Sequence, residues 1–154
     1  MNSATHFERL LIFGLFVSVL LQPNSASASC RFTSVSDISF ASYNVFSSSA
    51  NTSGVGSLTL KCGNEEHASN EVTLSTGQSN NYATRFMKSG SNRLNYNLYT
   101  NVSRTVVWGN GTGGSSVMKA DKNTTTLTIY GLIPSGQDAA FGSYQDTVTA
   151  TVDF

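Results

Sequence analysis

The sequence predicts an exported all-β sandwich, and its composition, its N-terminus and its cysteines support that prediction. Charged residues make up 12% of the 154 residues, and the formal net charge is zero. Many Ser, Thr and Asn residues with recurring β-branched and aromatic residues favour short strands over amphipathic helices or disorder. The neutral balance also lacks the basic excess that is typical of nucleic-acid binding.

The N-terminus has the pattern of a secretory signal. Residues 10–21 (LLIFGLFVSVLL) are an apolar run, and Ala26-Ser27-Ala28 supplies the small residues of a cleavage site. The run is too short for a comfortable membrane span. We therefore predict a signal peptide over 1–28 and one exported mature domain over 29–154 without a membrane anchor. A lipoprotein site at Cys30 is the weaker alternative, because no bulky aliphatic residue lies three positions before it.

The two cysteines predict one structural disulfide. A bridge between Cys30 and Cys62 would close a loop of 33 residues. Chain-entropy arguments give such a loop a stabilisation of roughly 3.5–4 kcal/mol. The sequence has no CxxC motif, so a metal pair or a redox site is disfavoured against a structural bridge.

The chain reads as a series of short strands separated by turn formers. Alternating apolar and polar residues mark half-buried strands, and clusters of Ser, Asn, Gly and Pro separate them. The expected strand regions are 30–40, 58–62, 72–74, 94–99, 106–108, 124–133 and 144–154. Strands at this spacing are typical of a sandwich.

The last expected strand suggests that the sandwich is incomplete. Its apolar residues alternate with threonines, so they share one face. An immunoglobulin-like sandwich should continue with a seventh strand, but the sequence ends at Phe154. We therefore expect an open groove and an unpaired edge that invites a strand from another chain. The residues of that face are Val148, Ala150, Val152 and Phe154.

Several different short motifs follow one another in a characteristic order along residues 30–154. Besides the paired cysteines, they lie at 40–43, 85–87, 96–100, 104–105, 108–114, 130–134 and 142–148. In this order they resemble the spore coat protein U domain family. That family includes subunits of archaic, Csu-type chaperone–usher pili and some secreted coat proteins.

The resemblance implies a fold and a set of partners. Family subunits are immunoglobulin-like sandwiches that lack their last strand. A periplasmic chaperone lends a strand, and a neighbouring pilus subunit replaces it at the outer-membrane usher. Phe154 would mark where the chaperone seats the subunit. Carried onto this chain, the strand-acceptor groove would be formed by Phe32, Ile38, Phe40, Val148, Ala150, Val152 and Phe154.

Three functional hypotheses follow from the resemblance. The favoured one is a structural pilus subunit at the cell surface that contributes to adhesion or biofilm. Cleavage after Ala28 would leave only Ser29 before Cys30, so we expect a subunit that accepts a strand without giving one. The alternatives are a free-standing secreted coat protein and a tip module that binds a carbohydrate or a surface. Trp108 is the candidate contact of such a module, although a half-buried core position is the preferred interpretation.

No enzymatic chemistry is predicted, and we expect no catalytic, cofactor or metal site. Residues 65–67 (Glu-Glu-His) are expected in a solvated loop, because a closed metal site needs three or four convergent ligands. The glycine-rich run 109–114 lacks the Gly-Lys-Ser/Thr ending of a phosphate-binding loop. Arg85, Lys88 and Arg93 are expected on a solvated face.

Overall fold

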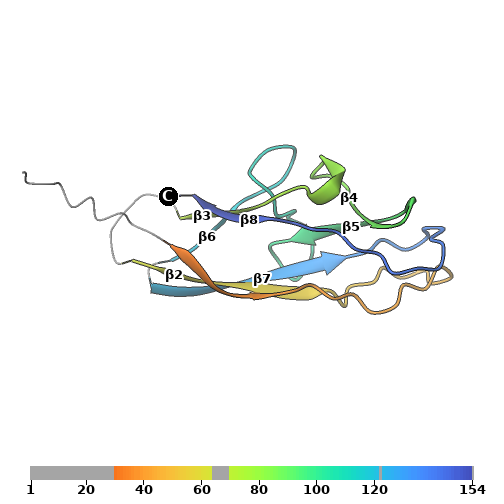
Figure 1. Cartoon of the computed structure of the whole chain (residues 1–154), viewed down its shortest axis with the longest axis horizontal. Helices are drawn as coiled ribbons and strands as arrows, with labels where there is room; N and C mark the ends of the chain where they lie inside the picture. Colours follow the sequence, from red (N-terminus) through yellow and green to blue (C-terminus); the bar gives the residue numbers. More distant parts are fainter. Residues whose placement is uncertain (1–29, 64–69, 122, 154) are drawn as a thin grey trace, which may run out of the picture.

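The computed structural model describes residues 30–63, 70–121 and 123–153, which fold into two β-sheets (Figure 1). The strands are β1 (Arg31–Ser36), β2 (Val55–Cys62), β3 (Glu71–Leu74), β4 (Arg85–Ser89), β5 (Asn92–Tyr99), β6 (Met118–Lys119), β7 (Asn123–Leu132) and β8 (Ala150–Asp153). A single 3-10 turn, η1 (Gly77–Ser79), separates β3 from β4. Within the described part of the chain, no helix is long and apolar enough to cross a membrane.

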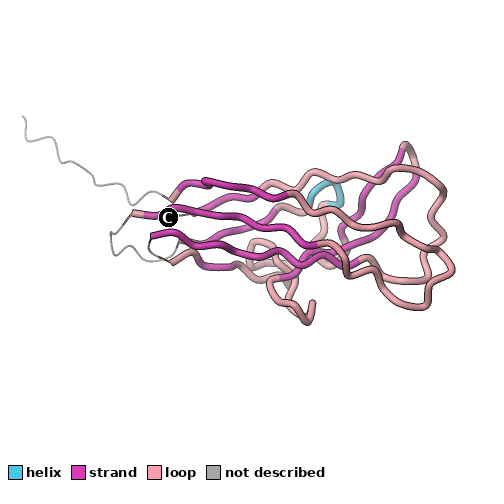
Figure 2. Tube along the Cα trace, turned by 90° about the horizontal axis from the view of Figure 1, so that it is seen from below, coloured by secondary structure: helices cyan, strands magenta, loops and turns pink. Residues whose placement is uncertain are grey.

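The two sheets confirm the predicted all-β sandwich. The larger sheet has the order β1-β2-β7-β5-β4, and the smaller one has the order β6-β3-β8. β2 and β7 are the longest pair, with Leu58 of β2 opposite Leu127 of β7. Long loops gather at the end of the molecule opposite the C-terminus, where the β4–β5 hairpin also lies (Figure 2).

The hydrophobic core follows from the two-residue period of the strands. On β2, Leu58, Leu60 and Cys62 are buried, whereas Thr59 and Lys61 between them are more exposed. β3 and β5 contribute alternating residues in the same way, because successive side chains of a strand point to opposite faces. The core members from these strands are Val72, Leu74, Leu94, Tyr96 and Leu98.

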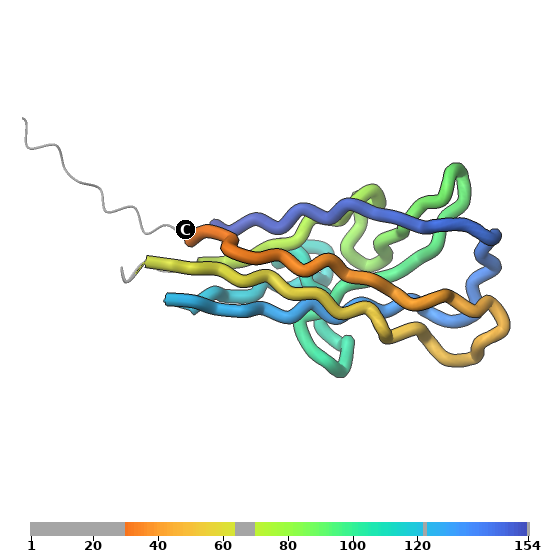
Figure 3. The backbone as a smooth tube through the Cα atoms, turned by 60° about the horizontal axis from the view of Figure 1, so that its bottom comes forward, coloured from red at the N-terminus to blue at the C-terminus, as the bar shows by residue number. Residues whose placement is uncertain are grey.

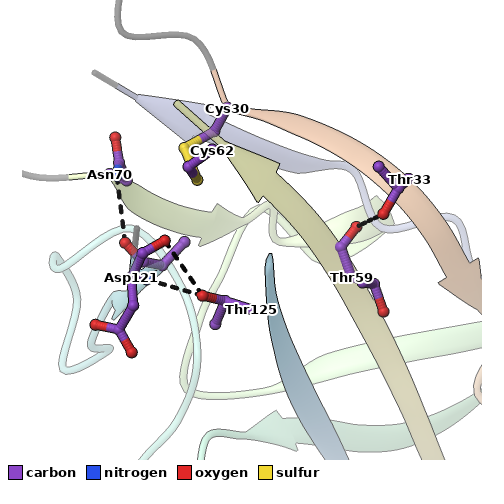
Figure 4. Close-up of a disulfide and its surroundings, with 8 residues drawn as sticks. Cys30, Thr33, Thr59, Cys62, Asn70, Asp121 and Thr125 are labelled. Atoms are coloured by element: carbon purple, nitrogen blue, oxygen red, sulfur yellow. Dashed lines mark hydrogen bonds between the residues drawn. A yellow bond between two sulfur atoms is a disulfide. The ribbon is translucent and has the colours of Figure 1, made fainter. Parts of the chain in front are cut away.

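A disulfide joins Cys30 to Cys62, which confirms the predicted pairing (Figure 4). Cys30 directly precedes β1 and Cys62 ends β2, so the bridge ties together the ends of two paired strands. Both sulfur-bearing side chains are buried. β1 carries a bulge after Phe32, where the Thr33 hydroxyl donates a hydrogen bond to the carbonyl of Thr59 (3.2 Å).

The strands differ from the expected ones in three ways. The expected strand regions 30–40 and 144–154 contain shorter strands, β1 (Arg31–Ser36) and β8 (Ala150–Asp153). One expected strand is absent, and one strand was not expected. Val106–Trp108 is not a strand, and Val107 and Trp108 form only isolated bridges to Tyr99 and Ser116. β4 was not expected as a strand, because its residues do not alternate by hydrophobicity: Arg85 and Met87 point inward, and Phe86 between them is only partly buried.

Candidate functional site

The two sheets each leave one edge strand beside the other. Among the described residues, β1 pairs only with β2, and β8 pairs only with β3. The two strands run along the same side of the molecule in opposite directions (Figure 3). Before β8, the chain is tied to both sheets, because Gln145 bridges Lys88 of β4 and the amide of Ser75, which follows β3, donates to the carbonyl of Thr149 (2.9 Å).

A largely apolar cavity of about 570 Å³ lies between these edges. One wall comes from β1 and the segment after it, and the other from residues 144–150. The expected groove residues that line it are Phe32, Ile38, Phe40, Val148 and Ala150. Val152 is half-buried against the core like these residues but is not part of the cavity lining, and Phe154 lies outside the described residues. The floor consists of Leu58, Leu74, Met87, Tyr96, Leu98 and Ile129.

Phe40 is held in this cavity by a ring and two glycines. Its ring meets the ring of Tyr96 edge-on, with centroids 6.1 Å apart. It also lies so close to Gly54 and Gly131 that a side chain at either position would overlap it. The Gly131 amide donates to the Gly54 carbonyl (2.8 Å), so the two glycines lie side by side and the aromatic ring packs on their backbones.

The inward-facing row of residues 144–152 also contains a carboxylate. Asp146 lines the cavity between Tyr144 and Val148. The Tyr96 hydroxyl donates to its Oδ2 atom (2.7 Å). Burial and this bond to Asp146 hold the pKa of Tyr96 well above its usual range.

Arg85 departs from its expected place on a solvated face. The side chain has no exposed surface, and its guanidinium donates to the carbonyls of Ser75 (2.8 Å) and Trp108 (2.8 Å) and to Oδ1 of Asn97 (2.7 Å). Burial lowers the pKa of Arg85, an effect that Tyr96 and other nearby groups partly oppose. The guanidinium therefore supports the cavity floor from beneath instead of facing solvent.

Trp108 also departs from its candidate role as a surface contact. It has no exposed surface, and its indole nitrogen donates to the carbonyl of Val72 (2.8 Å). A ring with both its faces in the core cannot stack on a ligand. Trp108 is therefore a core residue, as the preferred interpretation held, but it is fully buried and not half-buried.

A second cavity of about 800 Å³ continues from the first at the loop end. It shares Ile38, Phe40, Met87 and Tyr144 with the first cavity. Two of its lining residues are strongly exposed: Phe46 at 94% and Phe141 at 107% of full exposure. No charged residue occurs from 38 to 54, and none is among the described residues that line this second cavity.

Residues able to hold a metal do not converge in the described part of the chain. Across residues 30–63, 70–121 and 123–153, no group of three or more His, Cys, Asp or Glu lies together. The expected loop at 65–67 lies outside the described residues.

Comparison with known proteins assigns the chain to a family. The model of the Spore Coat Protein U domain matches residues 16–151, which is most of the chain. The chain belongs to the Spore Coat Protein U domain family. The resemblance that the motifs indicated is thereby confirmed.

Two known proteins show what this chain is similar to. Protein U of Myxococcus xanthus is 38% identical over 61 residues, which span 40% of this chain and 34% of that protein. A solved structure, the CsuC–CsuE chaperone–tip adhesion subunit pre-assembly complex of Acinetobacter baumannii Csu pili, matches with a TM-score of 0.56 and 25% identity. That match covers 82% of this chain and 40% of the other. The present chain thus spans well under half of either relative.

Several residues of the cavity were missed by sequence reasoning. Asp146 interrupts an otherwise apolar alternating row, and that interruption was a visible signal. Phe46 and Phe141 lie in polar, glycine- and serine-rich segments, where an isolated aromatic residue is a signal of exposure or of binding. The inward position of Arg85 had no signal in the sequence, because its partners come from three distant segments.

Proposed function

We propose that the mature chain is a structural subunit of an archaic, Csu-type chaperone–usher pilus, and that it accepts a β-strand from a partner. The observation that carries the proposal is the apolar cavity between β1 and β8, two edges without a strand partner on the cavity side in the described chain. An unpaired sheet edge is a ready template for an added strand.

An inserted strand would gain from both backbone and side chains. Its amides and carbonyls would pair with β1 and with the strand region that ends in β8, and its alternate side chains would enter the cavity. Burying one aliphatic side chain stabilises by about 1.5–3 kcal/mol. A partner strand with three such residues would therefore contribute much of the stability of a domain this small.

The proposed partners are a periplasmic chaperone, an outer-membrane usher and a neighbouring pilus subunit. Family membership supports this assignment, as does the structural likeness to a complex between a chaperone and a tip adhesion subunit. Export would depend on the predicted signal peptide over 1–28, and the assembled subunit would lie at the cell surface.

The test is to supply the missing strand within the same chain. An alternating valine strand is fused after Phe154 through a two-residue Asn-Gly turn, and the exported protein is unfolded in urea with and without it. We expect the fusion to raise the unfolding midpoint strongly. Val148→Asp, inside the cavity, should abolish the gain, whereas Thr149→Asp, on the exposed face of the same segment, should preserve it.

The same measurement distinguishes a strand-accepting subunit from the alternative of a free-standing coat protein. A free-standing coat protein needs no partner strand, so its unmodified chain would unfold cooperatively and the fused strand would change nothing. That result would overturn the strand-acceptor proposal.

The exposed aromatic residues favour a second role, attachment to an apolar surface at a fibre tip. Phe46 and Phe141 project from two loops at the end opposite the disulfide, and both border the second cavity. Replacing both with serine should reduce adsorption of the folded protein to polystyrene while leaving its urea midpoint unchanged. Val102→Ser is the matched control, since Val102 is 67% exposed on a different loop. Equal adsorption of all three proteins would refute this role.

A further inference from the structure

The cavity between β1 and β8 presents one polar position within an apolar lining. Along the wall that ends in β8, the inward residues are Tyr144, Asp146, Val148, Ala150 and Val152, and the residues between them are exposed. The floor below is hydrophobic. A strand lying in the cavity therefore meets a carboxylate at one of its inward positions and apolar groups at the neighbouring ones.

Asp146 is fixed in this position by its surroundings. Its Oδ1 atom accepts hydrogen bonds from the amides of Thr147 (2.8 Å) and Gln78 (3.1 Å), and also from the Gln78 side chain (3.3 Å). The carboxylate also packs on Gly77, where any side chain would overlap it. Asp146 therefore cannot turn away when a strand enters without breaking several bonds.

The second carboxylate oxygen has acceptor capacity left. From the described part of the chain, Oδ2 receives one hydrogen bond, donated by the Tyr96 hydroxyl, whereas a carboxylate oxygen can accept two. Among the residues that the structure describes in the lining of both cavities, the only other charged one is Asp37, and none is Lys or Arg. Arg85 lies below and acts on Asp146 through space, since the hydrogen bonds of its guanidinium in the described chain go to oxygens of Ser75, Asn97 and Trp108.

An entering strand would displace water from this half-buried carboxylate. Removing water from a charged group without a replacement hydrogen bond is costly. A carboxylate on the entering strand would add electrostatic repulsion to this cost. An aliphatic side chain opposite Asp146 would therefore lose there much of what it gains elsewhere. A side chain that carries an N–H or O–H would restore the lost bond.

We propose that Asp146 makes the cavity selective for the sequence of the strand that it accepts. The preferred strand carries apolar residues opposite Val148 and Ala150, and a hydrogen-bond donor such as Asn or Thr opposite Asp146. An acidic residue at that position is excluded. This inference rests on the proposed strand-acceptor function and names the chemistry of its partner.

The fused strand allows a direct test, because the turn sets its register. A two-residue turn after Phe154 pairs strand position 1 with residue 154, so position 9 faces Asp146, position 7 faces Val148 and position 5 faces Ala150. Each of these valines is replaced in turn by asparagine and by aspartate. Urea unfolding then gives the stability of each variant.

We expect asparagine at position 9 to match or exceed valine in stability. At positions 5 and 7, the same change should lower the folding equilibrium constant by about tenfold or more, because it buries an unpaired amide. Aspartate at position 9 should be far worse than asparagine there. In the Asp146→Asn background the difference between asparagine and aspartate at position 9 should shrink.

The outcomes separate the two proposals. If the valine strand does not stabilise the protein at all, the strand-acceptor function is refuted and the selectivity with it. If the valine strand stabilises but asparagine costs as much at position 9 as at positions 5 and 7, Asp146 is only structural and the inference alone is refuted. The scan in the wild-type background gives this answer even if Asp146→Asn fails to fold.

Discussion

Replacing Arg85 with methionine should destabilise the fold far more than a surface substitution does. Methionine fills a similar volume but has no N–H group, so it removes every hydrogen bond that the guanidinium makes. The carbonyls of Ser75 and Trp108 would lose these donors, while Oδ1 of Asn97 would keep the bond from the Leu98 amide.

The size of the effect follows from the two carbonyls that lose a donor. A buried acceptor without a partner costs about 1–3 kcal/mol, so two of them cost about 2–6 kcal/mol. Removing the buried charge returns part of its desolvation penalty, which favours the lower half of this range. Arg85→Lys should fall between wild type and Arg85→Met, because one ammonium cannot reach acceptors from three segments in the geometry of the planar guanidinium.

The assay is urea unfolding at neutral pH, with Arg93→Met as the matched control. Arg93 is exposed on the adjacent strand, with its guanidinium carbon 4.4 Å from the centre of the Phe86 ring. Loss of an exposed contact of this kind costs about 0.5–1 kcal/mol. If Arg85→Met is no more destabilising than Arg93→Met, the buried hydrogen bonds do not support the fold as argued.

Three further predictions follow from the same structure. Replacing Cys30 and Cys62 with alanine should lower the free energy of unfolding by roughly 3–4 kcal/mol, and a reductant should then no longer affect the urea midpoint. Gly131→Ala should destabilise strongly, because a phenylalanine ring covers it, whereas Gly63→Ala, with open space around it, should be nearly neutral; equal midpoints would contradict this packing. The pKa of Tyr96 is raised in the folded state, so its contribution to stability is complete below the ordinary tyrosine pKa of about 10 and declines as the pH rises beyond it; Tyr96→Phe should flatten that decline in alkaline unfolding curves.

The strands that alternate cleanly could be predicted from the sequence. β2, β5 and β7 place apolar residues at every second position toward the core, and period-2 alternation alone identifies such strands. β4 could not be found in this way, because its inward residues include an arginine. The inward position of Arg85 depends on oxygens of Ser75, Asn97 and Trp108, which come together only when the chain is folded.

The candidate site was predictable in part for the same reason. Val148 and Ala150 belong to an alternating row, so their common face is a local property of the sequence. Their closeness to Phe32 and Phe40 is a long-range property, and only the family resemblance suggested it. The floor residues, Met87 among them, come from strands that the sequence does not place relative to one another.

The bridge between the ends of β1 and β2 has a mechanical consequence. A pulling force applied to the chain before Cys30 would pass through the sulfur atoms to Cys62, which lies 32 positions later. At about 3.4 Å per extended residue, the bridge withholds about 110 Å of chain from extension. Under tension, β1 would thus stay alongside β2 and would not peel away from the N-terminal end. A domain held by this end would lengthen less before failing than one in which the first strand could be drawn out.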